Sequence, residues 1–282
     1  MILHITHNDL DGAGCAILMK KVFGDNLEYF SMNYDEIDDF ILKNFMNYEK
    51  IYITDLSPSL DVYKEVLKRK EIILIDHHKT SESFKIFDNV YHENDKCGTM
   101  LTFEYLEKTI NADLSKYYDF VKLVNDYDLW ILEDKRSLEL NKLFYLYGFE
   151  NFVNRFIKNY TIDFDEKEQF VLEIENERQK KYLESTADTV KIFKDRDNRQ
   201  FGVVFAEQYN SELGHNLISE KNLDYVIIIN IQKKKISLRS KIDVDVSKIA
   251  VANGGGGHKN AAGFSTDFNF CLEEFLKKVG VL

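Results

Sequence analysis

The chain has 282 residues, of which 44% are hydrophobic and 30% charged, which suits a globular protein of one large or two medium domains. Its formal net charge of −11 argues against a long electrostatic footprint on DNA or RNA, since such binding needs clustered lysine and arginine; a short anionic substrate held by metal ions remains compatible. From residues 1–6 we expect no signal peptide, and no apolar run approaches the roughly 18 residues of a membrane span.

Cysteine usage predicts a reducing location. Cys15, Cys97 and Cys271 are widely spaced and form no C-x-x-C pair. This spacing indicates neither a disulfide framework nor a thiolate zinc site. We therefore expect the cytoplasm.

Strands and helices alternate over the first part of the chain. The predicted strands cover residues 2–6, 27–32, 50–54 and 72–75. The predicted helices between them cover residues 13–23, 34–45 and 58–70. The last of these opens with Pro58, the single proline of the chain. This alternation predicts an α/β domain with a doubly wound parallel sheet.

Acidic and imidazole side chains follow three of the predicted strands. They are His7, Asp9 and Asp11 after the first strand, Asp55 after the third, and Asp76, His77 and His78 after the fourth. Because parallel strands end at the same edge of a sheet, we expect these side chains to lie close together. That edge is where open α/β sheets bind their ligands.

The next part of the chain is predicted to be mostly helical. A short strand at 84–90 is followed by helices at 97–110 and 114–124, and the second helix ends in a loop with two carboxylates. These are Asp126 and Asp128. A long connecting helix is predicted over 166–183, with apolar positions at Phe170, Val171, Ile174 and Tyr182.

A smaller mixed α/β domain is predicted near the carboxyl terminus. Its strands cover 190–193, 201–206, 225–231 and 235–239, and its helices cover 210–219, 246–252 and 270–279. The predicted division is therefore a catalytic domain at 1–160, a helical linker at 161–188 and a substrate-binding domain at 189–282.

The strand-end residues suit a centre of two divalent metal ions. Two such ions about 3.5–4 Å apart can activate a water and stabilise an in-line displacement at phosphorus. Oxygen and nitrogen ligands without thiolates favour Mn²⁺ or Mg²⁺ over structural zinc. The candidate ligands are His7, Asp9, Asp11, Asp55, His77 and Asp126. Asp55 is the candidate bridging carboxylate and, with Asp76 and His78, a candidate catalytic residue.

Each of these groups also has a purely structural interpretation. The Asp-x-Asp-Gly pattern favours turns, Asp55 can cap a helix, and Asp126 and Asp128 can form a solvated turn. Asp76 and the two histidines that follow it are harder to explain in this way, because such groups at the end of a buried strand need partners. Taken together, the strand-end pattern favours a metal site.

The glycine run at 254–257 is a candidate anion site, because glycine lets backbone N–H groups approach a ligand closely. A flexible loop is the alternative, although the small residues at 261–263 favour close packing. Arg239 can bind a phosphate or be a surface cation, and Thr99 can bind substrate or cap a helix. The candidate substrate-binding residues are Arg239, Gly255, Gly256, Gly257, His258 and Thr99.

The chain resembles the DHH/DHHA1 phosphoesterases, which include RecJ-type exonucleases, oligoribonucleases, pAp phosphatases and cyclic-dinucleotide phosphodiesterases. The four motifs of the first domain resemble residues 7–12, Asp55, residues 76–78 and Asp126. The DHHA1 glycine signature resembles residues 254–264, and Arg239 lies where the family has a substrate-binding arginine.

The resemblance implies a two-domain clamp, with two Mn²⁺ ions in the first domain and the nucleotide end held by the second. It also implies that His77 binds metal and His78 meets substrate. Either Asp126 or Asp128 fits the fourth motif; we favour Asp126 because Trp130, four positions on, matches the family spacing.

We predict a metal-dependent phosphodiesterase that trims short oligonucleotides to mononucleotides. Alternative substrates are pAp, cyclic dinucleotides and single-stranded DNA, and a catalytically silent nucleotide-binding protein is the alternative from another class. We expect neither a membrane nor long duplex DNA as partner, and a homodimer stays open.

Overall fold

This computed structural model describes residues 1–266 together with residue 277, so Cys271 and nearly all of the helix predicted at 270–279 lie outside the described residues. The chain divides into two compact units, residues 1–175 and 176–282. The division falls within α8 (Glu166–Ala187), so each unit contains part of the predicted linker. No helix among the described residues is both long and apolar enough to cross a membrane.

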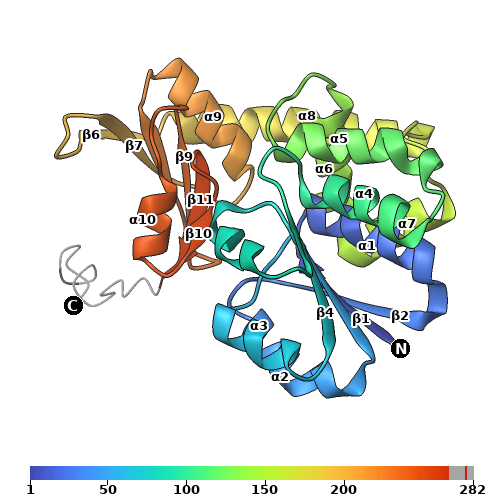
Figure 1. Ribbon diagram of the computed structural model, residues 1–282. Helices are drawn as coiled ribbons and strands as arrows, with labels where there is room; N and C mark the ends of the chain where they lie inside the picture. The colour runs from blue at the N-terminus through green and yellow to red at the C-terminus, as the bar shows by residue number, and fades with distance from the viewer. Residues whose placement is uncertain (267–276, 278–282) are drawn as a thin grey trace. The chain divides into compact units, whose positions relative to one another are not determined.

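The first unit is built on a five-stranded parallel sheet (Figure 1). The strands are β1 (Ile2–His7), β2 (Leu27–Met32), β3 (Lys50–Thr54), β4 (Glu71–Asp76) and β5 (Val90–His92). Their order is β2-β1-β3-β4-β5, and all neighbours are parallel. The strand order reverses between β1 and β3, and in such sheets this switch point is where ligands bind. The predicted doubly wound α/β fold is confirmed.

Helices cover both faces of this sheet, which explains why its inner strands β1, β3 and β4 are buried over most of their length. One face is covered by α1 (Leu10–Phe23), α4 (Gly98–Ile110), α5 (Tyr118–Asp128), α6 (Arg136–Tyr147) and α7 (Phe149–Lys158). The other face is covered by α2 (Ile37–Asn44) and α3 (Leu60–Leu67). Short 3-10 turns at Gly24–Asn26, Phe45–Asn47, Lys79–Ile86 and Ser115–Tyr117 complete the unit.

Three predicted elements of this unit differ from the structure. The strand expected at 84–90 is instead the end of a 3-10 helix, Lys79–Ile86, followed by a turn, and β5 begins only at Val90. The helix expected to end at residue 124 continues as α5 to Asp128. In α8, Phe170 and Ile174 are exposed, whereas Leu172 is buried on the face that carries Glu168. Glu168 is buried because it forms an ion pair with Arg155, which sequence periodicity does not reveal.

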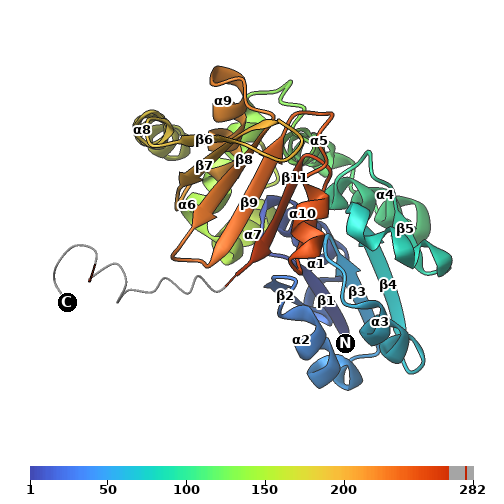
Figure 2. The same cartoon turned by 90° about the vertical axis from the view of Figure 1, so that its left-hand side faces the viewer.

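The second unit contains a six-stranded mixed sheet in the order β10-β11-β9-β8-β7-β6 (Figure 2). The strands are β6 (Lys191–Lys194), β7 (Gln200–Phe205), β8 (Tyr225–Asn230), β9 (Lys235–Ser240), β10 (Gly256–Gly257) and β11 (Ala261–Ser265). A core on one face lies under α9 (Asn210–Glu220), and a core on the other lies under α10 (Ser247–Ala252). The predicted second, smaller mixed domain is confirmed as a fold.

Candidate metal centre

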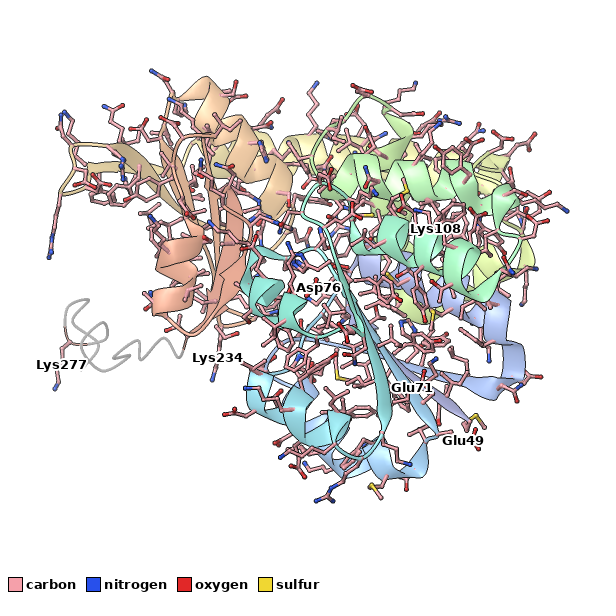
Figure 3. The ribbon with its side chains drawn as sticks, in the orientation of Figure 1. Glu49, Glu71, Asp76, Lys108, Lys234 and Lys277 are labelled. Atoms are coloured by element: carbon pink, nitrogen blue, oxygen red, sulfur yellow. The ribbon has the colours of Figure 1, made fainter. Side chains whose placement is uncertain are left out.

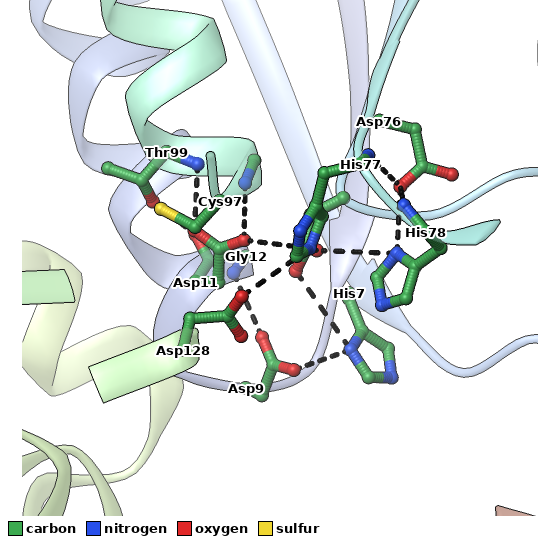
Figure 4. Close-up of polar contacts among 12 residues, drawn as sticks. His7, Asp9, Asp11, Gly12, Asp76, His77, His78, Cys97, Thr99 and Asp128 are labelled. Atoms are coloured by element: carbon green, nitrogen blue, oxygen red, sulfur yellow. Dashed lines mark hydrogen bonds and ion pairs between the residues drawn. The ribbon is translucent and has the colours of Figure 1, made fainter. Parts of the chain in front are cut away.

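Four elements of the first unit bring ligand-type side chains to the carboxyl edge of its sheet. Figure 3 marks this edge by Asp76 at the end of β4, whereas Glu71 lies at the other end of the strand. The contributing elements are the start of α1 with the loop before it, the residues after β3 and β4, and the last turn of α5. Figure 4 labels residues from the first of these, from the end of β4 and from α5. The predicted convergence of strand ends is therefore present in the structure.

The start of α1 carries two aspartates, Asp9 at its cap and Asp11 in its first turn, that face different partners. Asp9 caps α1, because its Oδ1 accepts from the Gly12 amide at 2.9 Å, and its Oδ2 lies 2.6 Å from Nδ1 of His7. Asp11 lies in the first turn of α1 and is buried. A Cβ atom at Gly12 would lie 2.0 Å from the His7 carbonyl oxygen, so this turn requires glycine.

Asp55 lies at the centre of the cluster. It follows β3 with a left-handed φ of 55° and is 1% exposed. Its Oδ1 lies 3.1 Å from Nε2 of His77, and its Oδ2 lies 4.0 Å from Nδ1 of His7. Burial, reinforced by the charges of Asp11 and Asp9, raises the pKa of Asp55 well above its usual value. Among the described residues, its Oδ2 has no hydrogen-bond partner.

The ligand-type atoms at this edge include two neighbouring groups of three, beside a group of four formed by Asp55, Asp76, His77 and His78. Those of His7, Asp9 and Asp55 lie within 4.8 Å of one another, and so do those of Asp11, His77 and Asp128. Nε2 of His77 lies 3.5 Å from Asp11 Oδ2 and 3.6 Å from Asp128 Oδ2. The contact between Asp55 and His77 joins the groups, so a carboxylate placed between two cation positions is geometrically available.

The two aspartates of α5 have different surroundings, which bears on the predicted choice of Asp126 as a ligand. Asp126 faces the loop that follows the helix: its carboxylate accepts from the amides of Glu133 (2.9 Å) and Asp134 (3.3 Å). That loop holds two bulky residues, Trp130 and Leu132, in left-handed conformations, which need such support. Asp128, two residues on, points to the cluster instead. Its pKa is raised well above the usual value by burial and by Asp11 and Asp9.

Asp76 supports the two histidines that follow it. Its Oδ1 accepts from Nδ1 of His78 at 2.8 Å and from the backbone amides of His77 (2.7 Å) and His78 (3.2 Å). Burial alone would raise the pKa of Asp76, but the adjacent imidazoles of His78 and His77 hold it below its usual value. Asp76 is therefore placed to orient His78 rather than to meet a substrate directly.

Thr99 does not lie where a substrate-binding residue was expected. It is fully buried in the first turn of α4, and both its amide and its hydroxyl bond to Asp11. Its burial and its bonds to Asp11 do not favour the predicted contact with substrate, which stays a prediction. Sequence alone does not show this, because a threonine at a helix start can face solvent or core.

The second unit places the remaining candidates on neighbouring strands. Arg239 on β9 pairs with Ala261 on β11, close to the turn at His258. The Arg239 guanidinium donates to the Ser211 hydroxyl at 2.8 Å, and Gly214 makes room for it, since a Cβ there would lie 2.6 Å from Cγ of Arg239. Ser211 and Gly214, both on α9, were not singled out by sequence analysis, because nothing in α9 marks them.

The glycine run forms an ordered hairpin rather than a loose loop. Gly256 and Gly257 form β10, which pairs with β11, and His258 closes the turn through its amide bond to the Ala261 carbonyl at 2.8 Å. A Cβ at Gly255 would lie 2.1 Å from the Gly263 carbonyl oxygen. The predicted close packing of this run is therefore observed.

Comparison with known proteins identifies two family domains along the chain. A family profile described as the DHH family, N-terminal domain, matches residues 1–127, and one described as the DHHA1 domain matches residues 171–280. Oligoribonuclease NrnB of Bacillus subtilis is 33% identical, over 92% of this chain and 71% of the relative.

Two further proteins are more distant. A 3′,5′-cyclic-nucleotide phosphodiesterase of Helicobacter pylori is 23% identical over 95% of both chains. The crystal structure of RecJ in complex with Mn²⁺ from Thermus thermophilus has a TM-score of 0.55 at 15% identity, and covers 99% of this chain and 50% of that one. The RecJ likeness shows a shared fold.

Proposed function

Because the chain belongs to the DHH family and carries a DHHA1 domain, we propose that it is a metal-dependent phosphodiesterase that degrades short oligonucleotides to mononucleotides. The observation that supports this most strongly is the pair of three-residue groups joined by Asp55 and His77. Buried carboxylates at this density need compensating positive charge.

The residues at the sheet edge fit two divalent cations. Oxygen and imidazole nitrogen are the available donors, and the buried Oδ2 of Asp55 lacks a hydrogen-bond partner among the described residues. The proposed ligands are His7, Asp9, Asp11, Asp55, His77 and Asp128. We propose Mn²⁺, with Mg²⁺ as the alternative, because this donor set suits both ions.

Bound ions would supply an activated water and positive charge at the phosphoryl oxygens. The chain contributes the geometry. Asp55 lies between the two ligand groups, and Asp76 fixes the His78 imidazole, which we propose contacts the phosphate under attack. In the second unit, we propose that Arg239 and the glycine hairpin hold a phosphate that does not react.

Short substrates are favoured by two independent observations. The relative with 33% identity is named an oligoribonuclease. The net charge of −11 is unfavourable for tracking long strands. We also retain the cytoplasm as the proposed location, since Cys15 and Cys97 are buried free thiols.

A substrate panel in Mn²⁺ tests this proposal. Labelled RNA of two to five nucleotides, a long RNA, a long single-stranded DNA and pAp are compared by kcat/KM. We expect the shortest RNAs to give the highest values. Equal or faster cleavage of the long strands would contradict the short-substrate proposal.

A second candidate function is hydrolysis of cyclic nucleotides or cyclic dinucleotides. The cyclic-nucleotide phosphodiesterase relative supports it, since it aligns over nearly its whole length. Adding these compounds to the panel decides between the two. Absence of both hydrolysis and Mn²⁺ binding would instead indicate a catalytically silent nucleotide-binding protein.

A further inference from the structure

One segment that contains none of the proposed ligands contacts three elements that carry them. This support segment, residues 92–99, runs from the last residue of β5 into the first turn of α4. It bonds to the residues after β4, to the first turn of α1 and to α5. Sequence analysis predicted no such role for it.

The first contacts hold the backbone of the two histidines after β4. The β4–β5 pairing ends at Asp76 and His92, so strand pairing between β4 and β5 does not hold the backbone of the residues that follow. Side chains of the support segment take over: Nε2–H of His92 donates to the His78 carbonyl at 2.8 Å, and the Asn94 amide donates to the His77 carbonyl at 2.9 Å. These bonds fix the positions from which both imidazoles project.

The second set of contacts holds Asp11. The amides of Gly98 and Thr99 donate to its two carboxylate oxygens at 2.6 and 2.7 Å, and the Thr99 hydroxyl donates to its backbone carbonyl at 2.7 Å. Donors at a helix amino terminus favour an ionised carboxylate. Gly98 also approaches Asp55 closely, since a Cβ there would lie 2.7 Å from Cβ of Asp55.

The third contact reaches α5. The Cys97 amide donates to Oδ1 of Asn125 at 2.9 Å. Asn125 and Asp128 are three residues apart on this helix and therefore lie on the same face. The bond thus anchors the end of α5 that directs Asp128 to the cluster.

We infer that residues His92, Asn94, Gly98 and Thr99 are positioning residues that hold the metal ligands in place before any cation binds. The inference rests on the proposed function for the identity of the ligands. Its physical basis is that crowded carboxylates repel one another, so without fixed donors they would separate in the metal-free protein. Such supporting hydrogen bonds typically change metal affinity when they are removed.

A purely structural role makes a different prediction from a positioning role. Replacing a residue with a purely structural role lowers the melting temperature of the metal-free protein but leaves the Mn²⁺ dissociation constant of the folded fraction unchanged. Replacing a positioning residue weakens Mn²⁺ binding. Isothermal titration of the full chain with Mn²⁺, together with thermal denaturation in EDTA, separates the two roles.

The principal variant is Thr99→Val, which keeps the side-chain shape and removes the hydroxyl donor. We expect Mn²⁺ to bind about 10-fold more weakly. Thr99→Ser retains the hydroxyl and should restore most of the affinity. Thr109→Val, the same substitution at an exposed position of α4, is the matched control and should bind Mn²⁺ as the wild type does.

Asn94→Ala is the second variant, because Asn94 is exposed and its truncation leaves the core intact. Weaker Mn²⁺ binding by either variant, with the control unchanged, supports the inference. Unchanged binding by both overturns it, whatever happens to the melting temperature. A wild-type chain that neither binds Mn²⁺ nor hydrolyses any substrate would overturn the proposed function instead, so the two failures are distinguishable.

Discussion

The acidic edge of the first unit and the glycine hairpin of the second differ in charge and in how they are held. At the edge, carboxylates from several elements crowd together, and the pKa of Asp55 is raised by burial and by neighbouring charges. At the hairpin, strand pairing places Arg239 beside Ala261, and two guanidinium bonds go to neutral groups, the Ser211 hydroxyl and the Leu238 carbonyl. The first region therefore suits the cations, and the second the phosphate, of the proposed function.

Because of this difference, we expect substitutions in the two regions to change different kinetic constants. Changes at the acidic edge should act on metal binding and on kcat. Changes beside the hairpin should act mainly on KM, because contacts to a phosphate that does not react contribute to binding.

The largest effect is expected for Asp55→Asn. We expect kcat to fall about 10³-fold, because an amide cannot replace a carboxylate between two cations. The metal-free protein should nevertheless melt at a higher temperature. A raised pKa means that the ionised Asp55 is disfavoured in the folded chain at neutral pH, and the substitution removes that charge. Hydrolysis assays and thermal denaturation in EDTA check both.

Asp88→Asn is the control for this variant, because Asp88 is exposed on the same unit. It should alter neither kcat nor the melting temperature. Near-normal kcat for Asp55→Asn would show that Asp55 has no role at the centre.

The next largest effect should distinguish the two aspartates of α5. Asp128→Ala should weaken Mn²⁺ binding and kcat by about 10–100-fold. Asp126→Ala should leave kcat of the folded protein little changed but lower the free energy of unfolding by about 1–3 kcal/mol, since it removes the acceptor of the Glu133 and Asp134 amides. Urea denaturation and Mn²⁺ titration measure these quantities. The reverse pattern would restore Asp126 as the ligand.

A smaller effect is expected in the second unit. Arg239→Lys keeps the charge and removes the planar fork, so KM should rise about 10-fold while kcat changes little. Arg199→Lys, at an exposed position, is the matched control. A loss confined to kcat would contradict the proposed division between the two regions.

The smallest effect concerns His4, a buried histidine of β1 that lies behind the acidic edge. Nε2 of His4 lies 2.8 Å from the Thr54 hydroxyl, which donates to Thr6, which donates to the Gly12 carbonyl. The His4 ring is therefore the donor at the start of this chain. Burial lowers the pKa of His4 from 6.5 to about 3.

Because the unfolded chain binds a proton at His4 below pH 6.5 and the folded chain does not, its contribution to stability is lost as pH falls below 6.5. Between pH 7.5 and 5.5, we expect the loss to be about 1.4 kcal/mol larger for the wild type than for His4→Asn. Urea denaturation of both proteins at the two pH values tests this. Equal losses of stability for the two proteins would show that His4 binds a proton as easily in the folded chain as in the unfolded chain.

Much of the first unit could be predicted because of a general property of parallel sheets. Strand ends meet at one edge whatever the details of packing, so Asp9, Asp55 and His77 could be grouped from the sequence. The choice between Asp126 and Asp128 depends instead on where α5 ends. Two positions on a helix differ by about 200° in direction, and a family spacing gave no information on that angle.

The contacts that the sequence did not reveal depend on how the elements pack against one another. Thr99 could be a surface or a core residue, and only the approach of α4 to the first turn of α1 places it behind Asp11. His92 and Asn94 act through backbone carbonyls, which leave no pattern in the sequence. Residues that bind other side chains were therefore easier to predict than residues that bind the main chain.

The left-handed backbone of Asp55 limits which amino acids evolution and protein engineers can place there. Among residues with a side chain, aspartate and asparagine adopt this conformation most readily, whereas branched or bulky residues are strained. A glutamate would therefore change more than the position of the carboxylate, since it would also disfavour the left-handed backbone conformation. In a saturation library selected only for folding, this codon should converge on asparagine, glycine and aspartate.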